Sequence, residues 1–450
     1  MGVESRPSKD PSPIFIKRIN HAIPQAERLR PLFVLLLTLI PLVAGLSPAF
    51  GEHAKPAKVL VAGLPSEINI AAAWLEIDPL SDPQVIPARS QDSGFTLEQL
   101  QRFVRLYFPR TYDRLLEYEY MVLAQVEIWV FTDEQQKMLY DSIYQGGLGG
   151  MQTRSVMSMH DGISRPWANS ILSDAFPNDA DAVVNLPSYT PHSEPMRVVI
   201  NTNEMVPPIY KPYKDLPGVE YSFIGAYGTN IAIPKEGALI VSYSVGPYKY
   251  GYPGAYPDPR FESPGWLPQS MYWTFGNGTT WTHQDMFGQY WNTVYNPYAP
   301  DMVLAELIFA TGRKLPDDVV ALHALRVKFT DYSSLKGFIY AIMDFAEKFG
   351  ANTASVTRSM SKVAQGVEDA EQFYLEQDFQ ESSSAMDEAL SELDHLKDES
   401  LKLKDRALMW VYVVEWLAVS GVSLVVGFAV WTLMIRRKLY KEVAVTRLAL

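Results

Sequence analysis

The chain contains no cysteine among its 450 residues. This absence excludes disulfide bonds, thiolate metal ligands and catalysis by a cysteine nucleophile. It leaves the compartment open, because a chain without cysteine is compatible with either redox environment. The composition is otherwise that of a folded protein, with 47% hydrophobic and 20% charged residues, so global disorder is also excluded.

Motifs for metals and phosphate-bearing cofactors are missing too. The seven histidines include no pair at helical ligand spacing and no His-Glu-x-x-His sequence. The aspartate cluster at 174–184 lacks the glycine and the final glutamate of a calcium loop, which favours a turn or cap. The GGLGG sequence at 146–150 has neither the lysine of a phosphate-binding loop nor the spacing of a dinucleotide-binding loop. We therefore expect no metal site and no cofactor.

Basic residues are scarce over most of the chain. Residues 51–435 hold 28 Lys and Arg against 47 Asp and Glu, a balance of −19. Such an acidic body is repelled by phosphate backbones, so we expect no nucleic-acid partner. Basic residues outnumber acids only at the two ends, by six to three in residues 1–30 and by five to one in residues 436–450.

Two long apolar runs adjoin these basic ends. Residues 31–50 carry no charge and residues 407–435 carry one, Glu415, and each run is long enough to cross a bilayer. The positive-inside rule then makes both ends cytoplasmic tails and places residues 51–406 outside the cytoplasmic membrane. Residues 31–50 are a membrane anchor or, alternatively, a signal peptide cleaved near Ala49. The lipid bilayer is the first partner that the sequence predicts.

The first part of the outer region alternates between strand and helix patterns. Short apolar runs indicate buried strands, and amphipathic segments that open with a Thr-x-x-Gln capping box indicate helices. This alternation predicts an α/β domain over 57–325, with a flavodoxin-like open, mostly parallel sheet and helices on both faces. The strands are expected at 59–64, 118–124 and 148–154, and the helices at 96–108 and 132–147.

The second part of the domain has Pro-rich loops and shorter strands. Residues 271–285 predict a β-hairpin that turns at Asn277-Gly278, because Asn-Gly is the strongest short hairpin signal. A helix over 301–313, opened by Asp301 and ended by Gly312, would close the domain. Further strands are expected at 197–201, 219–227 and 238–245.

Residues 330–406 have the pattern of a helical stalk. A helix at 337–350 precedes a helical hairpin over 353–406, with a break near Gln377, and the second arm continues into the membrane helix. Its many charges are expected to form a solvated face. The buried stripes are expected to be Val356, Met360, Val363 and Val367 on one arm, and Met386, Leu390, Leu393 and Leu401 on the other.

Several of these segments resemble a known family. The strand at 118–124 and the helix with its Gly-Gly turn at 132–151 resemble the stretch that precedes the nucleophile turn of class I glutamine amidotransferase-like domains. The segments at 272–291 and 296–316 are similar to the closing part of trehalose-utilisation-type and membrane-anchored members. The resemblance spans about 57–320, and the C-terminal segment resembles membrane anchors of such domains in prokaryotes, chiefly archaea.

The resemblance implies a lost activity. Glutaminases of the family use a cysteine on a strand-to-helix elbow, so this chain cannot hydrolyse glutamine by that mechanism. Ser155, Ser158, His160 and Asp161 follow the turn, but triads are assembled from distant parts of a fold and no Gly-x-Ser-x-Gly elbow is present. We therefore expect no catalytic residue.

A ligand crevice without catalysis is still expected. Ligands of open α/β sheets bind outside the carboxyl ends of the strands, where we place the GGLGGM turn and, near it, the aromatic hairpin. Arg154 would hold an anion or form a salt bridge, and His283 and Asp285 would share a ligand, a proton or a simple hydrogen bond. The candidate ligand-binding residues are Gly149, Gly150, Met151, Arg154, Trp273, Trp281, His283 and Asp285.

Aromatic residues are concentrated between 243 and 298, where they would stack on sugar rings or prolines or simply pack onto the domain. The sequence thus predicts a non-catalytic binding or scaffold module of the cell envelope, with an envelope protein or a glycan as its ligand. One alternative is an enzyme on the same fold with chemistry that needs no cysteine, such as a carbohydrate hydrolase. Another is a subunit or sensor of a membrane complex.

Overall fold

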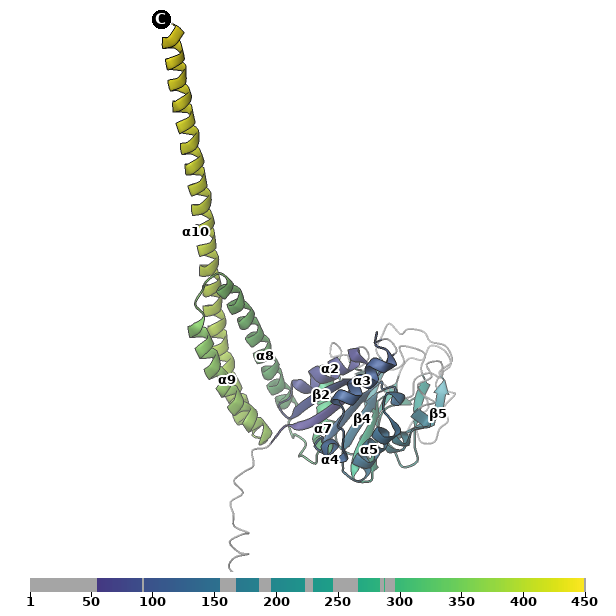
Figure 1. The fold of residues 1–450 in the computed structure, drawn as a ribbon. Coiled ribbons are helices and arrows are strands. Elements are labelled where there is room, and N and C mark those ends of the chain that lie inside the picture. The colour runs from purple at the N-terminus through teal and green to yellow at the C-terminus, as the bar shows by residue number, and fades with distance from the viewer. Residues whose placement is uncertain are drawn as a thin grey trace, which may run out of the picture. The chain divides into compact units, whose positions relative to one another are not determined.

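The computed structural model describes residues 55–90, 93–153, 167–185, 196–222, 230–245, 266–283, 287 and 296–448. The chain divides into two compact units, Met1–His53 and Ala54–Leu450. The expected tail at 1–30 and the apolar segment at 31–50 lie outside the described residues. The second unit contains the α/β domain and the helical stalk (Figure 1).

A mixed sheet forms the centre of the α/β domain. In the described residues it has nine strands in the order β2-β1-β3-β4-β11-β10-β9-β6-β7. The first five in this order are parallel and the others are antiparallel, so the parallel arrangement expected for most of the sheet covers one half of it. The strands are β1 Ala57–Gly63, β2 Ser81–Pro87, β3 Tyr120–Ala124, β4 Gly149–Thr153, β6 Met196–Ile200, β7 Tyr221–Ser222, β9 Leu239–Val245, β10 Trp266–Phe275 and β11 Gly278–His283; β5 Asn178–Asn185 and β8 Asn230–Pro234 form a small second sheet.

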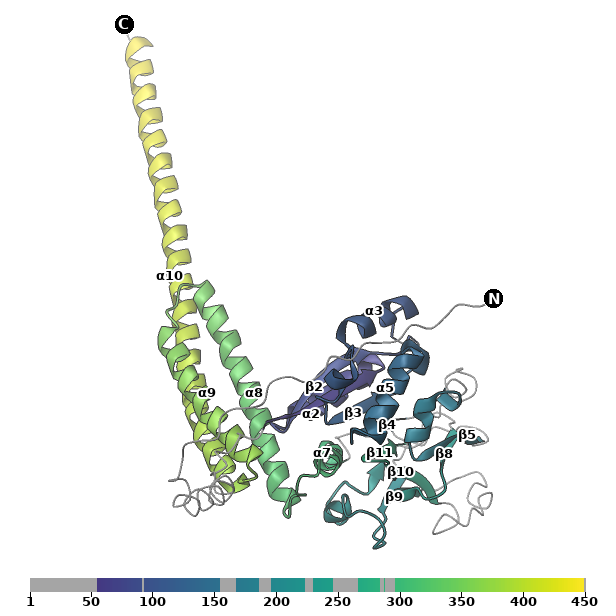
Figure 2. The same ribbon diagram turned by 60° about the horizontal axis from the view of Figure 1, so that its bottom comes forward.

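Helices cover both faces of the parallel half, as expected (Figure 2). On one face Val59 and Val61 of β1 pack with α2 (Pro65–Glu76) and α7 (Ala299–Ala310). On the other face Leu60 and Ala62 pack with α3 (Leu97–Tyr107) and α5 (Asp133–Tyr144). Burial on both faces explains why β1 is apolar at every position instead of at every second one.

Local signals placed several elements correctly. Thr96 accepts a hydrogen bond from the Gln99 backbone, while the Gln99 side chain accepts one from the Thr96 backbone, and Thr132 and Gln135 do the same at α5. The sequence did not reveal α2 or β2. Of the expected strand at 219–227, β7 is described and residues 223–229 lie outside the described residues.

The β10–β11 hairpin turns one residue earlier than expected. Phe275 pairs with Gly278, so Gly276 and Asn277 form the turn, and Gly276 has φ +60° as a type II′ turn requires. The packing of α5 explains the shift. A side chain at Gly276 would overlap the carbonyl oxygen of Tyr144, and the Asn277 backbone N–H donates to that same oxygen at 2.9 Å.

The stalk consists of three helices and starts earlier than expected. The helices are α8 Val319–Lys348, α9 Ala354–Leu375 and α10 Phe379–Leu448. The first of these, α8, runs without a break from Val319 and is capped by Asp318, so the helix expected at 337–350 begins earlier in the chain. The hairpin of α9 and α10 is confirmed, with Gln377 at φ +65° in its turn. Val356, Met360, Val363 and Val367 are buried as expected, and so are Met386 and Leu393.

The last helix, α10, is a single helix of 70 residues (Figure 1). Its first part buries Leu393 and Leu396 in the stalk. Its second part contains a window with a mean hydropathy of 2.1, none of which is buried. By length and composition, this part is compatible with a membrane anchor.

Candidate functional site

The sequence-predicted glycines lie at the opposite edge of the sheet from the expected crevice. Gly149 is the first residue of β4 and pairs with Tyr120, the first residue of β3, so the GGLGGM turn lies at the amino edge. The expectation was wrong because α5 returns the chain to this edge before β4 begins. A Cβ on Gly149 would lie 2.5 Å from that of Ala310, so the glycine allows β4 to pack against α7.

The expected aromatic wall is divided between two faces. Met151 and Trp281 are fully buried, and Trp281 contacts the rings of Tyr272 and Phe309 on the α7 side. Trp273 pairs with Thr280 and therefore points to the other face, where Lys235 Nζ lies 5.0 Å from its ring centroid. Arg154 and Asp285 lie outside the described residues, as do Ser155, Ser158, His160 and Asp161.

His283 alone among the expected residues is described at the carboxyl edge, as the last residue of β11. The Ser270 hydroxyl lies 2.7 Å from its Nδ1, and Glu306 Oε1 lies 2.9 Å from its Nε2. Glu306, in the middle of α7, also accepts hydrogen bonds from the Tyr120 and Tyr210 hydroxyls. We call Ser270, His283, Glu306, Tyr120 and Tyr210 the carboxyl-edge network after His283; Tyr120 begins β3 at the amino edge and reaches Glu306 through its hydroxyl.

The donors to Glu306 follow from the chemistry of its carboxylate. A carboxylate only accepts, so Nε2 of His283 donates to Glu306, while the Ser270 hydroxyl and Nδ1 share a hydrogen bond whose direction is set by the tautomer. Burial, and then the negative charge of Glu306, raises the pKa of Tyr120 and of Tyr210 well above the usual value. Both tyrosines therefore stay protonated and remain donors to Glu306.

Ser270, His283 and Glu306 are the three residue types of a hydrolase triad, but their geometry differs from that of a triad in two respects. The two ring nitrogens have exchanged partners, because the serine is on Nδ1 and the acid is on Nε2. In addition, Ser270, His283 and Glu306 are each at most 1% exposed. A nucleophile must reach its substrate, so this arrangement acts as a buried hydrogen-bond network in the structure.

A second group of polar residues follows β2 and β3 at the same edge. Arg89 donates from Nη1 to Gln125 Oε1 at 2.7 Å, and Ser90 donates from its backbone and hydroxyl to Glu127 at 3.0 and 2.7 Å. Gln125 has φ +55°, in the left-handed region. Strained backbone of this kind persists where neighbouring contacts hold it and is frequent at binding sites.

Three buried polar atoms at the ends of β3 and β4 have no hydrogen-bond partner among the described residues: Gln125 Nε2, Gln152 Oε1 and Thr153 Oγ1. The residues that carry them are neighbours at the ends of two adjacent strands. Ala124 pairs with Thr153, and the Gln125 backbone donates to the Thr153 carbonyl. The three atoms comprise a donor, an acceptor and a hydroxyl. These unpaired groups are uncharged and, like Ser270, are buried in the structure.

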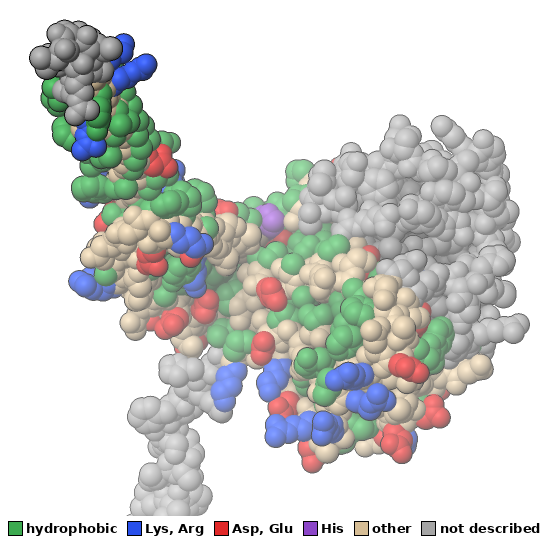
Figure 3. Space-filling model, turned by 45° about the horizontal axis from the view of Figure 1, so that its top comes forward, with side chains coloured by type: hydrophobic (Ala, Val, Ile, Leu, Met, Phe, Trp, Pro, Cys, Tyr) green, Lys and Arg blue, Asp and Glu red, His purple; other side chains and the backbone are tan. Residues whose placement is uncertain are grey.

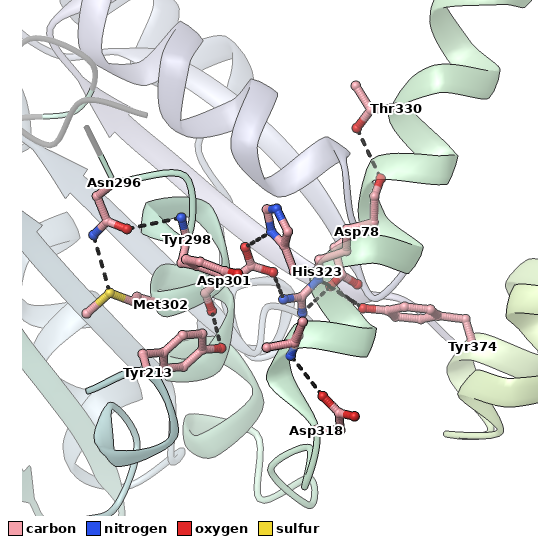
Figure 4. Close-up of polar contacts among 12 residues, drawn as sticks. Asp78, Tyr213, Asn296, Tyr298, Asp301, Met302, Asp318, His323, Thr330 and Tyr374 are labelled. Carbon is pink, nitrogen blue, oxygen red and sulfur yellow. Dashed lines mark hydrogen bonds and ion pairs between the residues drawn. The ribbon is translucent and has the colours of Figure 1, made fainter. Parts of the chain in front are cut away.

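A separate polar cluster, the joint network, connects the α/β domain to the stalk (Figure 4). Arg326 of α8 is buried and pairs with Asp78 at 2.5 Å and with Asp301 at 2.6 Å. Tyr374 of α9 donates to Asp78, and His323 Nδ1 lies 2.7 Å from Asp301. Burial lowers the pKa of Arg326, but Asp78, Tyr374 and Asp301 outweigh it and raise that pKa well above the usual value.

Sequence reasoning missed most of these residues. Glu306 carried a signal, because it is the one acid within the apolar stretch 302–310. Asp301 was expected to open α7, yet the helix starts two residues earlier at Ala299, with Pro300 in its first turn, and the Asp301 side chain pairs with Arg326 instead. Ser270, Tyr210, Asp78 and Arg326 gave no local signal.

The comparisons with known proteins add little to this geometry. No family model and no curated protein matches the chain. Among solved structures, it is similar to a β-galactosidase from Bacillus circulans sp. alkalophilus, with 12% identity, a TM-score of 0.32 and coverage of 63% of this chain and 35% of that one. It is also similar to a carbohydrate deacetylase, with 9% identity, a TM-score of 0.30 and coverage of 57% and 32%. The chain thus spans about a third of each neighbour, and likeness of this size assigns neither a family nor an activity.

Proposed function

We propose that this protein is anchored in a membrane and carries, on a helical stalk, an extracytoplasmic α/β domain that serves as a non-catalytic binding or scaffold module of a cell envelope. The observation that carries the proposal is the continuity of α10. One helix is packed against α8 and α9 in its first part and fully exposes apolar side chains in its second part. An exposed apolar band of this length in a folded protein indicates a lipid environment.

The charges on α10 define the membrane-spanning part. Residues 416–435 lie between Glu415 and Arg436 and contain no charge. Twenty helical residues rise about 30 Å, which is the thickness of the hydrocarbon core. Trp416 and Trp431 lie toward the two boundaries, as interfacial tryptophans do, and the basic cluster at 436–438 supports a cytoplasmic location for that end.

The stalk keeps the domain away from the bilayer. Between Phe379 and Glu415, α10 rises about 54 Å. The joint network attaches the α/β domain at the Phe379 end, through Tyr374 of α9 and Arg326 of α8. This arrangement supports a display or scaffold role better than it supports chemistry on lipid.

The strand order β2-β1-β3-β4-β11 supports a flavodoxin-like sheet, and with it the relation to class I glutamine amidotransferase-like domains of membrane-anchored archaeal type. In such sheets ligands bind at the carboxyl ends of the strands, where Gln125 and Thr153 offer unpaired groups. Uncharged donors and acceptors of this kind suit a glycan or the backbone of an envelope protein. The absence of cysteine excludes the family's glutaminase mechanism.

Anchoring is tested by placing charge inside the apolar band. Leu424→Arg combined with Val426→Arg should move the full chain out of the carbonate-resistant membrane fraction, because arginine near the bilayer centre costs about 2.5–3.5 kcal/mol per residue. The matched control is Leu439→Arg with Tyr440→Arg, beyond the basic cluster, which should leave the chain in the membrane. Retention of the first variant at the level of the control would contradict the proposal.

An enzyme on the same fold is the alternative, and the observation in its favour is the arrangement of Ser270, His283 and Glu306. A fluorophosphonate reagent labels serines that such a relay activates. Because Ser270 is fully buried, we expect no labelling of the native chain. Labelling that disappears in Ser270→Ala would favour the hydrolase instead.

A further inference from the structure

An unpaired basic surface lies on α3, in a domain that is otherwise acidic. Arg102 and Arg105 of α3 and Arg110 just after it are exposed and form no ion pair or hydrogen bond with the described residues. Leu106 and Tyr107 between them are 56% and 52% exposed. We call these five residues the arginine surface. Figure 3 shows one face of this domain, on which Lys and Arg side chains are interspersed with acids.

A matching acidic surface runs along the stalk. Glu381, Glu388, Glu392 and Glu399 are spaced by seven, four and seven residues, which places them in one row on α10. All four are exposed, and the row is about 27 Å long at 1.5 Å per residue. Glu388 and Glu392 form no ion pair with the described residues. We call this row the glutamate row.

Within the described part of the chain, neither surface is covered by another element. The main contacts of α3 are with β2 and with the short helix Ile128–Val130, whereas those of α10 are with α8 and α9. Each surface carries mainly charge of one sign, with Glu98 as the acid one turn before Arg102 on α3. Arginine and tyrosine are also the residues that contribute most often to protein–protein contacts.

We propose that the arginine surface of one copy docks on the glutamate row of a second copy of this chain. Charge complementarity selects the partner, because both surfaces are exposed on the same protein. The proposal rests on the membrane anchoring proposed above, since copies anchored in one bilayer share an orientation and a raised local concentration. Individual exposed ion pairs are weak and are screened by salt, so the contact should form readily in the membrane and only weakly in dilute solution.

The contact joins two different surfaces and is therefore heterologous. Contacts of this kind close into rings or continue as open rows. Leu106 and Tyr107 would add apolar area at the centre of the contact, beside the arginines. A row of domains held above the bilayer extends the proposed scaffold role from one molecule to an assembly.

The absence of cysteine makes a direct test possible. A single Ser333→Cys substitution on the exposed side of α8 allows the full chain to be labelled with a donor or an acceptor dye and reconstituted in neutral-lipid vesicles. We expect energy transfer between copies at about 50 mM salt that falls at about 500 mM, where the Debye length is several times shorter. Arg102→Glu with Arg105→Glu should weaken the association at least tenfold, and Glu388→Lys with Glu392→Lys should do the same.

The decisive arm mixes the two charge-reversed variants. Glutamates on the arginine surface of one variant then face lysines on the glutamate row of the other, and energy transfer should return. The matched control, Lys211→Glu with Lys214→Glu, changes the charge equally at exposed positions on the α7 side of the α/β domain, away from both surfaces, and should associate like the wild type. Wild-type energy transfer in the first variant, or no recovery in the mixture, would overturn the proposal.

Two further readouts separate the possible failures. Flotation of the vesicles reports insertion, so a chain that does not float contradicts the membrane anchoring. Sedimentation of the full chain in detergent measures self-association without insertion. An association that changes neither with salt nor with any of the four charge-reversal substitutions overturns the docking in either case. Binding of dextran sulfate that is lost in Arg102→Glu with Arg105→Glu, without any change in self-association, would instead assign the arginine surface to a foreign polyanion.

Discussion

The two buried polar networks stabilise their buried carboxylates in different ways. The carboxyl-edge network surrounds one carboxylate, Glu306, with donors from β3, β11 and the loop that contains Tyr210. The joint network places two carboxylates, Asp78 and Asp301, around one guanidinium. The first lies wholly within the α/β domain, whereas the second connects that domain to α8 and α9. The difference indicates that the first stabilises the domain and the second determines how firmly the domain is held on its stalk.

The largest effect is expected at the joint. Arg326→Met should reduce the free energy of unfolding by about 3–5 kcal/mol, because Asp78 and Asp301 would remain buried without their positive partner. Urea unfolding of the full chain in detergent measures this loss. Adding Asp78→Asn and Asp301→Asn should recover most of it, since fully neutral replacements of a buried ion network are often tolerated. Failure of the triple variant to recover would show that packing, and not charge, dominates the joint.

A smaller effect is expected in the carboxyl-edge network. Glu306→Gln keeps the shape but supplies one acceptor oxygen to three donors, so the free energy of unfolding should fall by about 1–3 kcal/mol. The matched control is Glu388→Gln on the exposed side of α10, which should change it by less than about 0.5 kcal/mol. Equal effects in the two variants would mean that Glu306 is not held as the distances indicate.

The sequence predicted what local chemistry determines. The apolar run of β1, the capping boxes of α3 and α5, and the turn at Gln377 each depend on neighbours within a few residues, and each is confirmed. β2 was missed because Pro83 and Pro87 argue against a strand, although both are tolerated at the sheet edge where β2 lies. α2 was missed because apolar residues occupy nearly all of its sides.

The site depended on tertiary contacts that no local pattern contains. Asp78 and Arg326 are 248 residues apart, and Tyr210 and Glu306 are 96 apart. Gly149 illustrates a different error. The turn before it was predicted correctly from local sequence, but we expected it at the carboxyl edge of the sheet and it lies at the amino edge. The edge follows from the direction in which α5 returns the chain, and this is a property of the topology.

Alkaline pH should weaken both networks. Burial is the leading cause that raises the pKa of Tyr120, Tyr210 and Tyr374 well above the usual value, and it raises the pKa of Tyr213 as well. A raised folded-state pKa means that the stability is fully present below about pH 10 and is lost as the pH rises further. Each buried tyrosine should contribute a loss of about 1 kcal/mol per pH unit above pH 10.

Single tyrosine variants measure how much each network contributes to this loss of stability at alkaline pH. Tyr120→Phe and Tyr374→Phe should each make the decrease between about pH 10 and pH 11 less steep, when the free energy of unfolding is measured at intervals across that range. Tyr340→Phe, at an exposed position on α8, provides the control and should leave the slope unchanged. A slope that none of the buried variants alters would assign the alkaline transition to other groups.

The smallest effect is expected beside the carboxyl-edge network, and it should have the opposite sign. Thr153 pairs with His283 across β4 and β11, and its buried hydroxyl has no hydrogen-bond partner in the described part of the chain. Replacing an unpaired buried hydroxyl by a methyl group of the same shape removes a desolvation penalty, so Thr153→Val should raise the free energy of unfolding by about 1 kcal/mol. Thr153→Ser keeps the hydroxyl and should give no such gain. A gain in stability would identify Thr153 as a position where stability is sacrificed for binding, as is common at functional sites. If Thr153→Val destabilises the chain instead, the hydroxyl has a partner within the protein, and the carboxyl edge is then as fully satisfied as the joint.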